Sequence, residues 1–229
     1  MMDAVILCGG KGERLRGVVS DRPKPLALVG GRPFLELLTD YVHGFGFARF
    51  VLCAGYLGEM IRDHFAARRL PYEVAVSVEK EPLDTAGAIK LAEPLLRTPR
   101  FLALNGDSLV KADLRAFAAF HEARRPLASL AAARKADASA FGTLDVAADG
   151  RLLAFREKAA AASGLVNAGL YIFEREALAA VPPGKKYSLE RDLFPALAAR
   201  GAVNVLEVPG ELIDIGTPEG YRRAGEELA

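Results

Sequence analysis

Short apolar segments alternate with longer amphipathic segments along the first half of the chain. Because continuously apolar strands are buried on both faces, this order predicts an α/β fold with a mostly parallel sheet covered by helices on both sides. The apolar runs are rich in β-branched and small residues, and they predict strands at 4–8, 50–55, 73–78, 101–106 and 127–133. The segments between them space their apolar residues at helical intervals, and they predict helices at 33–46, 57–69 and 113–125.

The second half of the chain, after about residue 134, has a different pattern with fewer helices and mixed β-structure. Ser188 suits the N-cap of a helix, Gly201 suits its end, and Pro218 suits the first turn of a terminal helix. We therefore expect one domain over 1–229, made of the halves 1–134 and 135–229. The pattern predicts strands within 141–157 around a turn at 148–150, strands at 167–174 and 211–216, a loop or short helix at 158–164, and a helix over 188–201.

Charge and composition narrow the classes of partner. The chain has 30 basic and 29 acidic residues and a formal net charge of +1, so it lacks the broad positive field that non-specific nucleic-acid binding uses. No apolar stretch approaches the roughly 18 residues of a membrane span, and the N-terminus is unlike a signal peptide. We therefore expect a soluble cytoplasmic protein that binds neither nucleic acid nor membrane, and the sequence does not predict its oligomeric state.

The cysteines and histidines give no sign of a metal site. Cys8 and Cys53 each lie in an apolar run, which predicts reduced core residues rather than a disulfide framework. His43, His64 and His121 lie in separate helical segments without the spacing of metal ligands. We expect the histidines to be partly exposed structural residues.

The stretch LCGGKGERLRGVVSDRPKPL, residues 7 to 26, follows the first predicted strand. Its glycine spacing fits neither a dinucleotide fingerprint nor a P-loop. Glycines at 9, 10 and 12 would let backbone N–H groups approach phosphate oxygens, and Arg14 and Lys24 would supply positive charge. Taken alone, the stretch is equally typical of a glycine-rich surface turn with solvated basic residues.

Acidic residues follow several predicted strands. Asp107 and Asp214 are each placed at a strand end, where open α/β sheets bind ligands, and two carboxylates with open positions suit Mg²⁺. A helix N-cap or turn is the ordinary alternative for Asp107. Glu79 could accept the adjacent N1–H and N2–H donors of guanine, whereas uracil and thymine offer one N3–H donor. A solvated glutamate at a strand end is an equally good reading of Glu79.

The order of these motifs resembles the sugar-1-phosphate nucleotidyltransferases. The resemblance covers nearly the whole chain, and it implies a Rossmann-like three-layer α/β/α fold with a mostly parallel mixed central sheet. It also implies transfer of a nucleoside monophosphate from a nucleoside triphosphate (NTP) to a sugar 1-phosphate, with release of pyrophosphate. The matching motifs are LCGGKGERLR, PKP, EPLDTAGAI (81 to 89), NGD (105 to 107), FGTL (141 to 144), EK (157 to 158), NAG (167 to 169) and DIGTP (214 to 218).

The resemblance implies a role for each matching residue. Residues 1–134 form the nucleotide-binding half and 135–229 the sugar-phosphate-binding half. In this reading Arg14 and Lys24 are catalytic and Asp107 and Asp214 hold Mg²⁺. The nucleotide is bound by Leu7, Gly9, Gly10, Gly12, Glu13, Glu79, Thr85, Gly87 and Asn105, although no specific contact is implied for Glu13. The sugar hydroxyls are bound by Gly142, Glu157, Asn167 and Gly169, and the 1-phosphate by Lys158.

One departure from the family pattern and one alternative interpretation qualify these roles. Asp84 stands where the common GTAG motif has its first glycine, which affects the detail of the base contact. Glu157 and Lys158 could also form an ordinary ion pair on a helix surface.

Within the family, the run SDRPKPLALV is most similar to enzymes that transfer guanylate from GTP to D-glycero-α-D-manno-heptose 1-phosphate for bacterial surface glycans. Glu13 and Asp84 are also compatible with N-acetylmuramate 1-phosphate uridylyltransferases. Mannose- and glucose-1-phosphate nucleotidyltransferases are further alternatives. Two other classes stay open: a retaining-type glycosyltransferase, which usually has an Asp-x-Asp motif where this chain has Asp107-Ser108-Leu109, and a non-catalytic nucleotide-sugar sensor.

Overall fold

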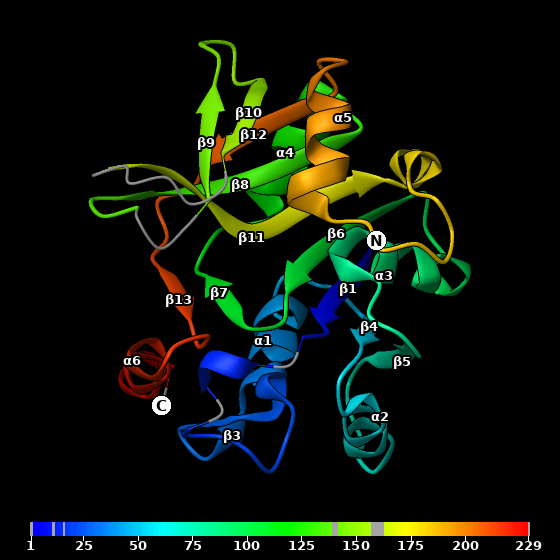
Figure 1. The fold of residues 1–229 in the computed structure, drawn as a ribbon, viewed down its shortest axis with the longest axis vertical. Coiled ribbons are helices and arrows are strands. Elements are labelled where there is room, and N and C mark those ends of the chain that lie inside the picture. The colour runs from blue at the N-terminus through cyan, green and yellow to red at the C-terminus, as the bar shows by residue number, and fades with distance from the viewer. Residues whose placement is uncertain (1, 11, 16, 139–141, 157–162, 229) are drawn as a thin grey trace.

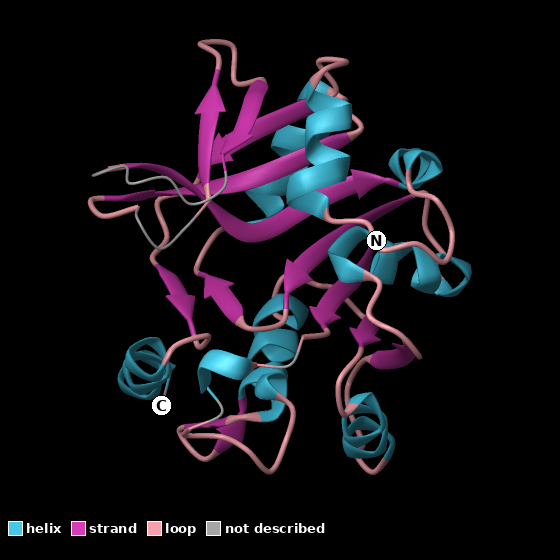
Figure 2. Cartoon of the chain, viewed as in Figure 1, coloured by secondary structure: helices cyan, strands magenta, loops and turns pink. Residues whose placement is uncertain are grey.

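The parallel strands predicted in the first half form the centre of the sheet (Figures 1 and 2). The computed structural model describes residues 2–10, 12–15, 17–138, 142–156 and 163–228. The strands run in the order β6, β1, β4, β5, and each neighbouring pair is parallel. Their bounds are Asp3–Cys8 for β1, Arg49–Ala54 for β4, Glu73–Val78 for β5 and Arg100–Asn105 for β6.

The second half continues the same sheet with antiparallel pairs. The long strand β11 joins the halves, because it pairs with β6 and β9 along one edge and with β8 along the other, antiparallel in each case. Strand β12 pairs with β8 in parallel, and β9 and β10 form a hairpin. The strands are β8 (Ala128–Lys135), β9 (Thr143–Val146), β10 (Leu152–Arg156), β11 (Gly164–Glu174) and β12 (Val203–Glu207). The sheet is therefore mixed, with its parallel centre in the first half.

Helices cover both faces of the sheet, as the sequence predicts. Successive side chains of a strand point to opposite faces, so in β1 Ile6 belongs to the core cluster that includes residues of α1, α2, α4 and α6, whereas Val5 belongs to the cluster that includes residues of α3 and α5. The helices are α1 (Phe34–His43), α2 (Gly58–Ala66), α3 (Asp84–Ala92), α4 (Leu114–Arg124), α5 (Phe194–Ala198) and α6 (Pro218–Leu228). This arrangement is the three-layer α/β/α fold.

Short elements complete the chain around this sheet. Two of the 3₁₀ turns, at Glu13–Leu15 and Lys24–Leu26, follow β1. Strands β7 (Ser108–Val110) and β13 (Leu212–Asp214) pair antiparallel. The remaining short elements are the β2 (Leu28–Val29) and β3 (Arg32–Pro33) hairpin and 3₁₀ turns at Glu93–Leu95 and Arg175–Ala180.

The helix predicted over 188–201 is divided in the structure. One π-helical turn, Leu189–Leu193, precedes α5, and the N–H of Leu193 bonds to the carbonyl of Ser188 at 3.0 Å, five residues back. Pro195 has no N–H and cannot donate to the carbonyl four residues earlier, so a regular α-helix cannot run through this point. The predicted N-cap is confirmed, because the Ser188 hydroxyl accepts from two backbone N–H groups of the turn.

The predicted exposure of the histidines is wrong for His121. His43 and His64 are partly exposed, but His121 is fully buried. Its ring bonds to Ser129 Oγ at 2.8 Å and to Glu174 Oε1 at 3.3 Å, and burial lowers its pKa. The helical pattern of α4 could not show that residues of β8 and β11 lie against this side of the helix. Both cysteines are buried and free, as predicted. Among the described residues, no helix is long and apolar enough to cross a membrane.

Candidate active site

The predicted functional residues of the first half meet at the carboxyl ends of the central strands β1 and β6. Leu7 near the end of β1 is paired with Asn105 at the end of β6, so the glycine-rich stretch and Asp107 leave the sheet side by side. Asp214 ends β13, and the N–H of Ile215 donates to the carbonyl of Asp107 at 3.0 Å. The predicted placement of both aspartates at strand ends is therefore confirmed, and the β7–β13 pairing brings them together.

Two cations lie beside these aspartates. Arg14 and Lys24 stand on the 3₁₀ turns after β1, and each turn is fixed by a buried leucine, Leu15 or Leu26. Lys24 Nζ donates to Asp107 Oδ2. Each buried leucine thus anchors its turn in the core, and the charged end of Arg14 or Lys24 is left near the two aspartates.

Gly216 marks the point around which these charges gather. A β-carbon at Gly216 would lie 2.7 Å from Asp214 Oδ1, 3.3 Å from Arg14 Nη2 and 3.3 Å from Lys24 Nζ. We call Arg14, Lys24, Asp107 and Asp214 the charge cluster. Its two positive and two negative groups come from four separate segments of the chain.

The two carboxylates of the charge cluster repel each other. Burial raises the pKa of Asp214, and the charge of Asp107 raises it further, while Arg14 and Lys24 act in the opposite direction. Asp214 Oδ1 accepts the N–H of Gly216 at 2.6 Å. A pair of carboxylates with further coordination positions open fits Mg²⁺, which keeps waters and substrate phosphates as its other ligands. In the part of the chain that the structure describes, no three potential metal-ligating side chains of His, Cys, Asp or Glu come together.

A hollow of about 280 Å³ adjoins the charge cluster on the side of β1 and α3. We call it the nucleotide hollow, because residues predicted to bind the nucleotide line it. Glu79 lies against the glycine-rich loop here: a β-carbon at Gly9 would be 3.5 Å from Glu79 Oε1, while Oε2 accepts the N–H of Leu83 at 2.9 Å. Burial raises the pKa of Glu79. Six residues predicted to bind the nucleotide line this hollow: Leu7, Gly9, Gly10, Glu79, Thr85 and Asn105.

The other nucleotide residues are placed differently. Gly12 packs against the stem of Lys24, because a β-carbon there would be 3.2 Å from Lys24 Cβ. The N–H of Gly87 donates to the carbonyl of Tyr187 at 2.9 Å, and a β-carbon would lie 2.7 Å from the carbonyl oxygen of Lys185. Both glycines therefore allow close packing, and their contact with a nucleotide stays a prediction.

A second hollow, of about 370 Å³, lies between the two halves and shares Asp84, Asn105 and Asp107 with the first. We call it the sugar hollow. Gly142 and Asn167 line it, as do Arg14 and Asp214 of the charge cluster. Two predicted sugar residues, Glu157 and Lys158, lie outside the described residues, and the side chain of Glu13 is also not described.

Asn167 is fixed by its neighbours. Its Nδ2 donates to the hydroxyl of Tyr171 at 2.7 Å, and its Oδ1 accepts the N–H of Gly169 at 3.0 Å. Gly169 has φ +68°, and a β-carbon there would lie 2.8 Å from Asn105 Nδ2. Asn167 lines the sugar hollow, and its Nδ2 carries a second N–H besides the one that bonds to Tyr171, while Gly169 serves to bring β11 against Asn105.

Several residues of the sugar hollow were not predicted as site residues. They are Asp84, Ser108, Phe155, Ser188, Glu190, Arg191 and Leu212. For Asp84 the available signal was its substitution for the usual glycine. No local pattern marked Glu190 and Arg191, because their place in the site depends on the docking of the 187–191 segment against α3.

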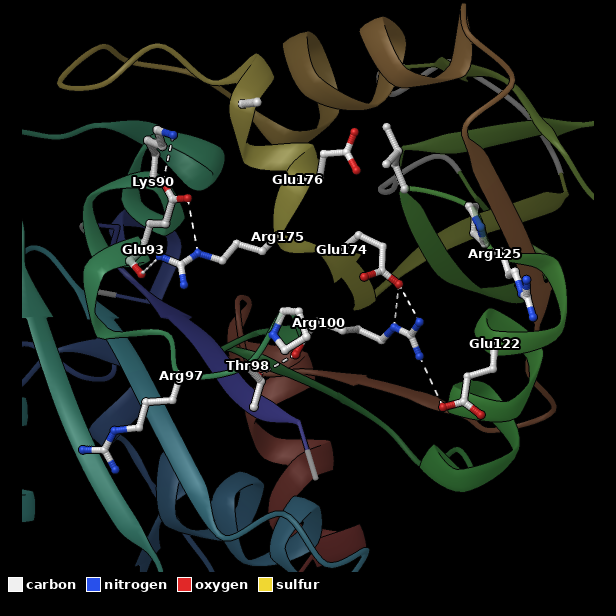
Figure 3. Close-up of a pocket in the computed structure, with 14 residues that line it drawn as sticks. Lys90, Glu93, Arg97, Thr98, Arg100, Glu122, Arg125, Glu174, Arg175 and Glu176 are labelled. Atoms are coloured by element: carbon white, nitrogen blue, oxygen red, sulfur yellow. Dashed lines mark hydrogen bonds and ion pairs between the residues drawn. The ribbon is translucent and has the colours of Figure 1, made fainter.

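A larger hollow, of about 1180 Å³, lies at the opposite ends of the strands, near the start of β6 and the end of β11 (Figure 3). None of the predicted site residues lines it. Arg100, at the start of β6, pairs with Glu174 at 2.6 Å and with Glu122 at 3.2 Å, and Arg175 pairs with Glu93 at 3.4 Å. Arg100 and Arg175 are already paired with carboxylates there, and no residue of the matching motifs lines this hollow, so its size alone does not make it the substrate site.

The chain is similar to known proteins over nearly its whole length. A family model described as "Nucleotidyl transferase" matches residues 3–229. The chain is 34% identical to D-glycero-alpha-D-manno-heptose 1-phosphate guanylyltransferase from Aneurinibacillus thermoaerophilus, covering 99% of this chain and 98% of that protein. It is also 34% identical to mannose-1-phosphate guanylyltransferase from Mycobacterium tuberculosis, covering 99% of this chain but 64% of the longer relative.

A solved structure gives the same result. The crystal structure of HddC from Yersinia pseudotuberculosis complexed with GMP-PN superposes with a TM-score of 0.88 and 31% identity, and the match covers 100% of both chains. The similarity therefore extends over the whole sheet and over both halves of the chain.

Proposed function

This chain belongs to the nucleotidyl transferase family, and we propose that it transfers guanylate from GTP to a sugar 1-phosphate, with D-glycero-α-D-manno-heptose 1-phosphate as the preferred acceptor. The products are a GDP-sugar, a precursor of bacterial surface glycans, and pyrophosphate. Relatives named for this heptose reaction and for mannose 1-phosphate both use guanylate, which supports the choice of base.

The charge cluster is the observation that carries the proposal. The reaction brings an anionic sugar phosphate toward a polyanionic triphosphate, so its main barrier is electrostatic repulsion. Arg14 and Lys24, beside Asp107 and Asp214 around Gly216, supply fixed charge where that repulsion arises. The two adjoining hollows would hold the two substrates with their phosphates meeting at the shared Asn105 and Asp107.

The chemistry needs few further groups from the protein. The attacking phosphate oxygen of the sugar 1-phosphate is already ionised at neutral pH, so no general base is required. Arg14 and Lys24 would neutralise the triphosphate and the charge that develops on the leaving pyrophosphate, and the walls of the sugar hollow would hold the acceptor in line.

Mg²⁺ is the cofactor that we propose for this site. Asp107 and Asp214 would hold the ion, since their mutual repulsion and their carboxylate oxygens suit a hard divalent cation. When bound, the ion would supply additional positive charge to the triphosphate. The cytoplasmic location expected from the sequence, and the roles of residues 157 and 158, remain predictions.

Glu79 gives the first specific prediction, which concerns the base. Replacing Glu79 by glutamine puts an NH₂ donor where the N1–H and N2–H donors of guanine would meet a carboxylate. We expect kcat/KM for GTP to fall by about tenfold to a hundredfold, the effect of losing a hydrogen bond to a charged group, with a smaller change for UTP. The measurement is pyrophosphate release with each nucleotide and a common sugar 1-phosphate.

Glu59→Gln is the matched control for this substitution, because Glu59 is an exposed glutamate of α2 that pairs with Arg62 at 2.5 Å. This substitution should leave kcat/KM unchanged for both GTP and UTP. An equal loss with GTP and UTP in Glu79→Gln would show that Glu79 does not select the base.

A substrate panel tests the function itself. The protein is incubated with GTP, UTP, dTTP, ATP or CTP and with heptose, mannose, glucose or N-acetylmuramate 1-phosphates in the presence of Mg²⁺. We expect the fastest pyrophosphate release with GTP and the heptose 1-phosphate. Release with UTP and N-acetylmuramate 1-phosphate would instead support a uridylyltransferase, and no release with any pair would support a nucleotide-sugar sensor or glycosyltransferase.

A further inference from the structure

An ion pair joins the two halves of the chain across the wall of the sugar hollow. Asp84, at the first position of α3, pairs through Oδ2 with Nη2 of Arg191 on the π-helical turn. Both residues line the sugar hollow. The Asp84 side chain is 30% exposed and the Arg191 side chain is 59% exposed, so the pair is accessible to a ligand in the hollow.

Asp84 occupies a backbone conformation that favours glycine. Its φ is +63°, in the left-handed region, where aspartate is tolerated better than most residues but is still less favourable than glycine. An exposed ion pair contributes little to the free energy of unfolding. The pair therefore offsets little of the free-energy cost of this backbone conformation. Strained positions of this kind are concentrated at functional sites.

The surrounding contacts hold the pair in place. Asp84 Oδ1 accepts the N–H of Thr85 at 2.8 Å, and the Thr85 hydroxyl accepts the N–H of Leu189 at 2.7 Å. Glu190 Oε2 accepts from the hydroxyls of Ser188 at 3.0 Å and Thr85 at 3.3 Å. The start of α3 and the turn that carries Arg191 are thus bonded together, and a guanidinium and two carboxylates are fixed on one wall.

The position of this wall indicates its ligand. The acceptor's 1-phosphate must lie at the charge cluster to react, so its sugar ring extends away from the cluster into the sugar hollow. Arg191 and Glu190 line the sugar hollow but not the nucleotide hollow, whereas Asp84 lies where the two hollows adjoin. Guanidinium N–H groups donate and carboxylate oxygens accept, which is the combination that neighbouring sugar hydroxyls require.

We propose that the Asp84–Arg191 pair is a sugar-recognition element that binds neighbouring ring hydroxyls of the acceptor and selects their configuration. This inference rests on the proposed function. Asp84 orients Arg191 and accepts from one hydroxyl, Arg191 donates to the next, and the phosphates are left to the charge cluster.

The test compares Asp84→Asn, Asp84→Gly and Arg191→Ala with the wild-type protein. The glycine variant removes the carboxylate without backbone strain, so it is expected to fold. Each variant should raise KM for the sugar 1-phosphate about tenfold, the effect of one hydrogen bond to a charged group, while KM for GTP stays within about twofold. Arg62→Ala is the control, because Arg62 forms a comparable exposed pair on α2, far along the sheet at β4 and β5.

Acceptors that lack one hydroxyl give the decisive comparison. Calorimetry measures the binding of the parent sugar 1-phosphate and of its single deoxy analogues to each protein. For the analogue that lacks the recognised hydroxyl, wild type and Arg191→Ala should bind equally. An equal loss for the parent and for every analogue, or a rise in KM for GTP instead, would overturn the inference.

The two proposals fail in different ways. If the wild-type protein releases no pyrophosphate with any substrate pair, the proposed function is wrong, while the calorimetric comparison still decides the role of Asp84 and Arg191. If the wild-type protein turns over normally and the variants keep its KM for the sugar 1-phosphate, only the sugar-recognition role is wrong.

Discussion

Replacing Arg14 or Asp107 by alanine is expected to lower pyrophosphate release by about a hundredfold or more. Removing one group that stabilises developing charge has effects of this order in other enzymes. Arg14 lies near Lys24 and Asp214 around Gly216, and Asp107 accepts from Lys24, so each substitution disturbs the balance of the charge cluster. The measurement is the rate of pyrophosphate release at saturating GTP and sugar 1-phosphate.

Thermal unfolding provides the control for these two variants. Arg14 is exposed and the Asp107 side chain is 35% exposed, and neither packs in the core, so the melting temperature should change little. Near-normal turnover by either variant would remove that residue from the catalytic group. A large fall in melting temperature would mean that the residue supports the fold instead.

Gly216→Ala should reduce turnover by about a hundredfold while leaving the protein folded. The added β-carbon would lie 2.7 Å from Asp214 Oδ1 and 3.3 Å from both Arg14 Nη2 and Lys24 Nζ. These atoms are the ends of side chains, so they can move aside without unfolding the chain. Displacements approaching 1 Å at reacting groups cost about a hundredfold in rate, and steady-state kinetics with circular dichroism would measure both effects.

Gly225→Ala in α6 is the matched substitution, because among the described residues no atom beyond its chain neighbours and the adjacent backbone of its own helix lies within 4 Å of the β-carbon that it would add. It should retain full turnover and a similar or slightly higher stability, since alanine favours helix more than glycine. Equal activity in the two alanine variants would mean that the charge cluster tolerates displacement and that its geometry does not set the rate.

The sequence predicted the central strands well because their apolar runs are buried on both sides. It missed β12 (Val203–Glu207), and it began β11 at residue 167 instead of 164, because the first part of β11 is paired with Arg134 and Lys135 of β8. Such pairing depends on residues distant in sequence. The same reason explains the division of the predicted 188–201 helix, where the local effect of Pro195 outweighs the helical pattern.

The placement of a site residue could be predicted from the sequence where it depends only on the residue's position along its own strand. Asp107 and Asp214 were placed at strand ends from the apolar runs alone, but their proximity depends on the pairing of β7 with β13 across about a hundred residues. The Asp84–Arg191 pair could not be predicted, because it requires both the positive φ of Asp84 and the docking of the 187–191 segment on α3.

The pairing of β6 with β11 limits how this protein could have diversified. Residues 170–174 of β11 complete the edge of β6 that continues to Asn105, so a cut between the halves would leave two unpaired strand edges, which are templates for aggregation. A half taken from a relative could therefore replace one half of this chain only if its own strand restored the pairing between β6 and β11.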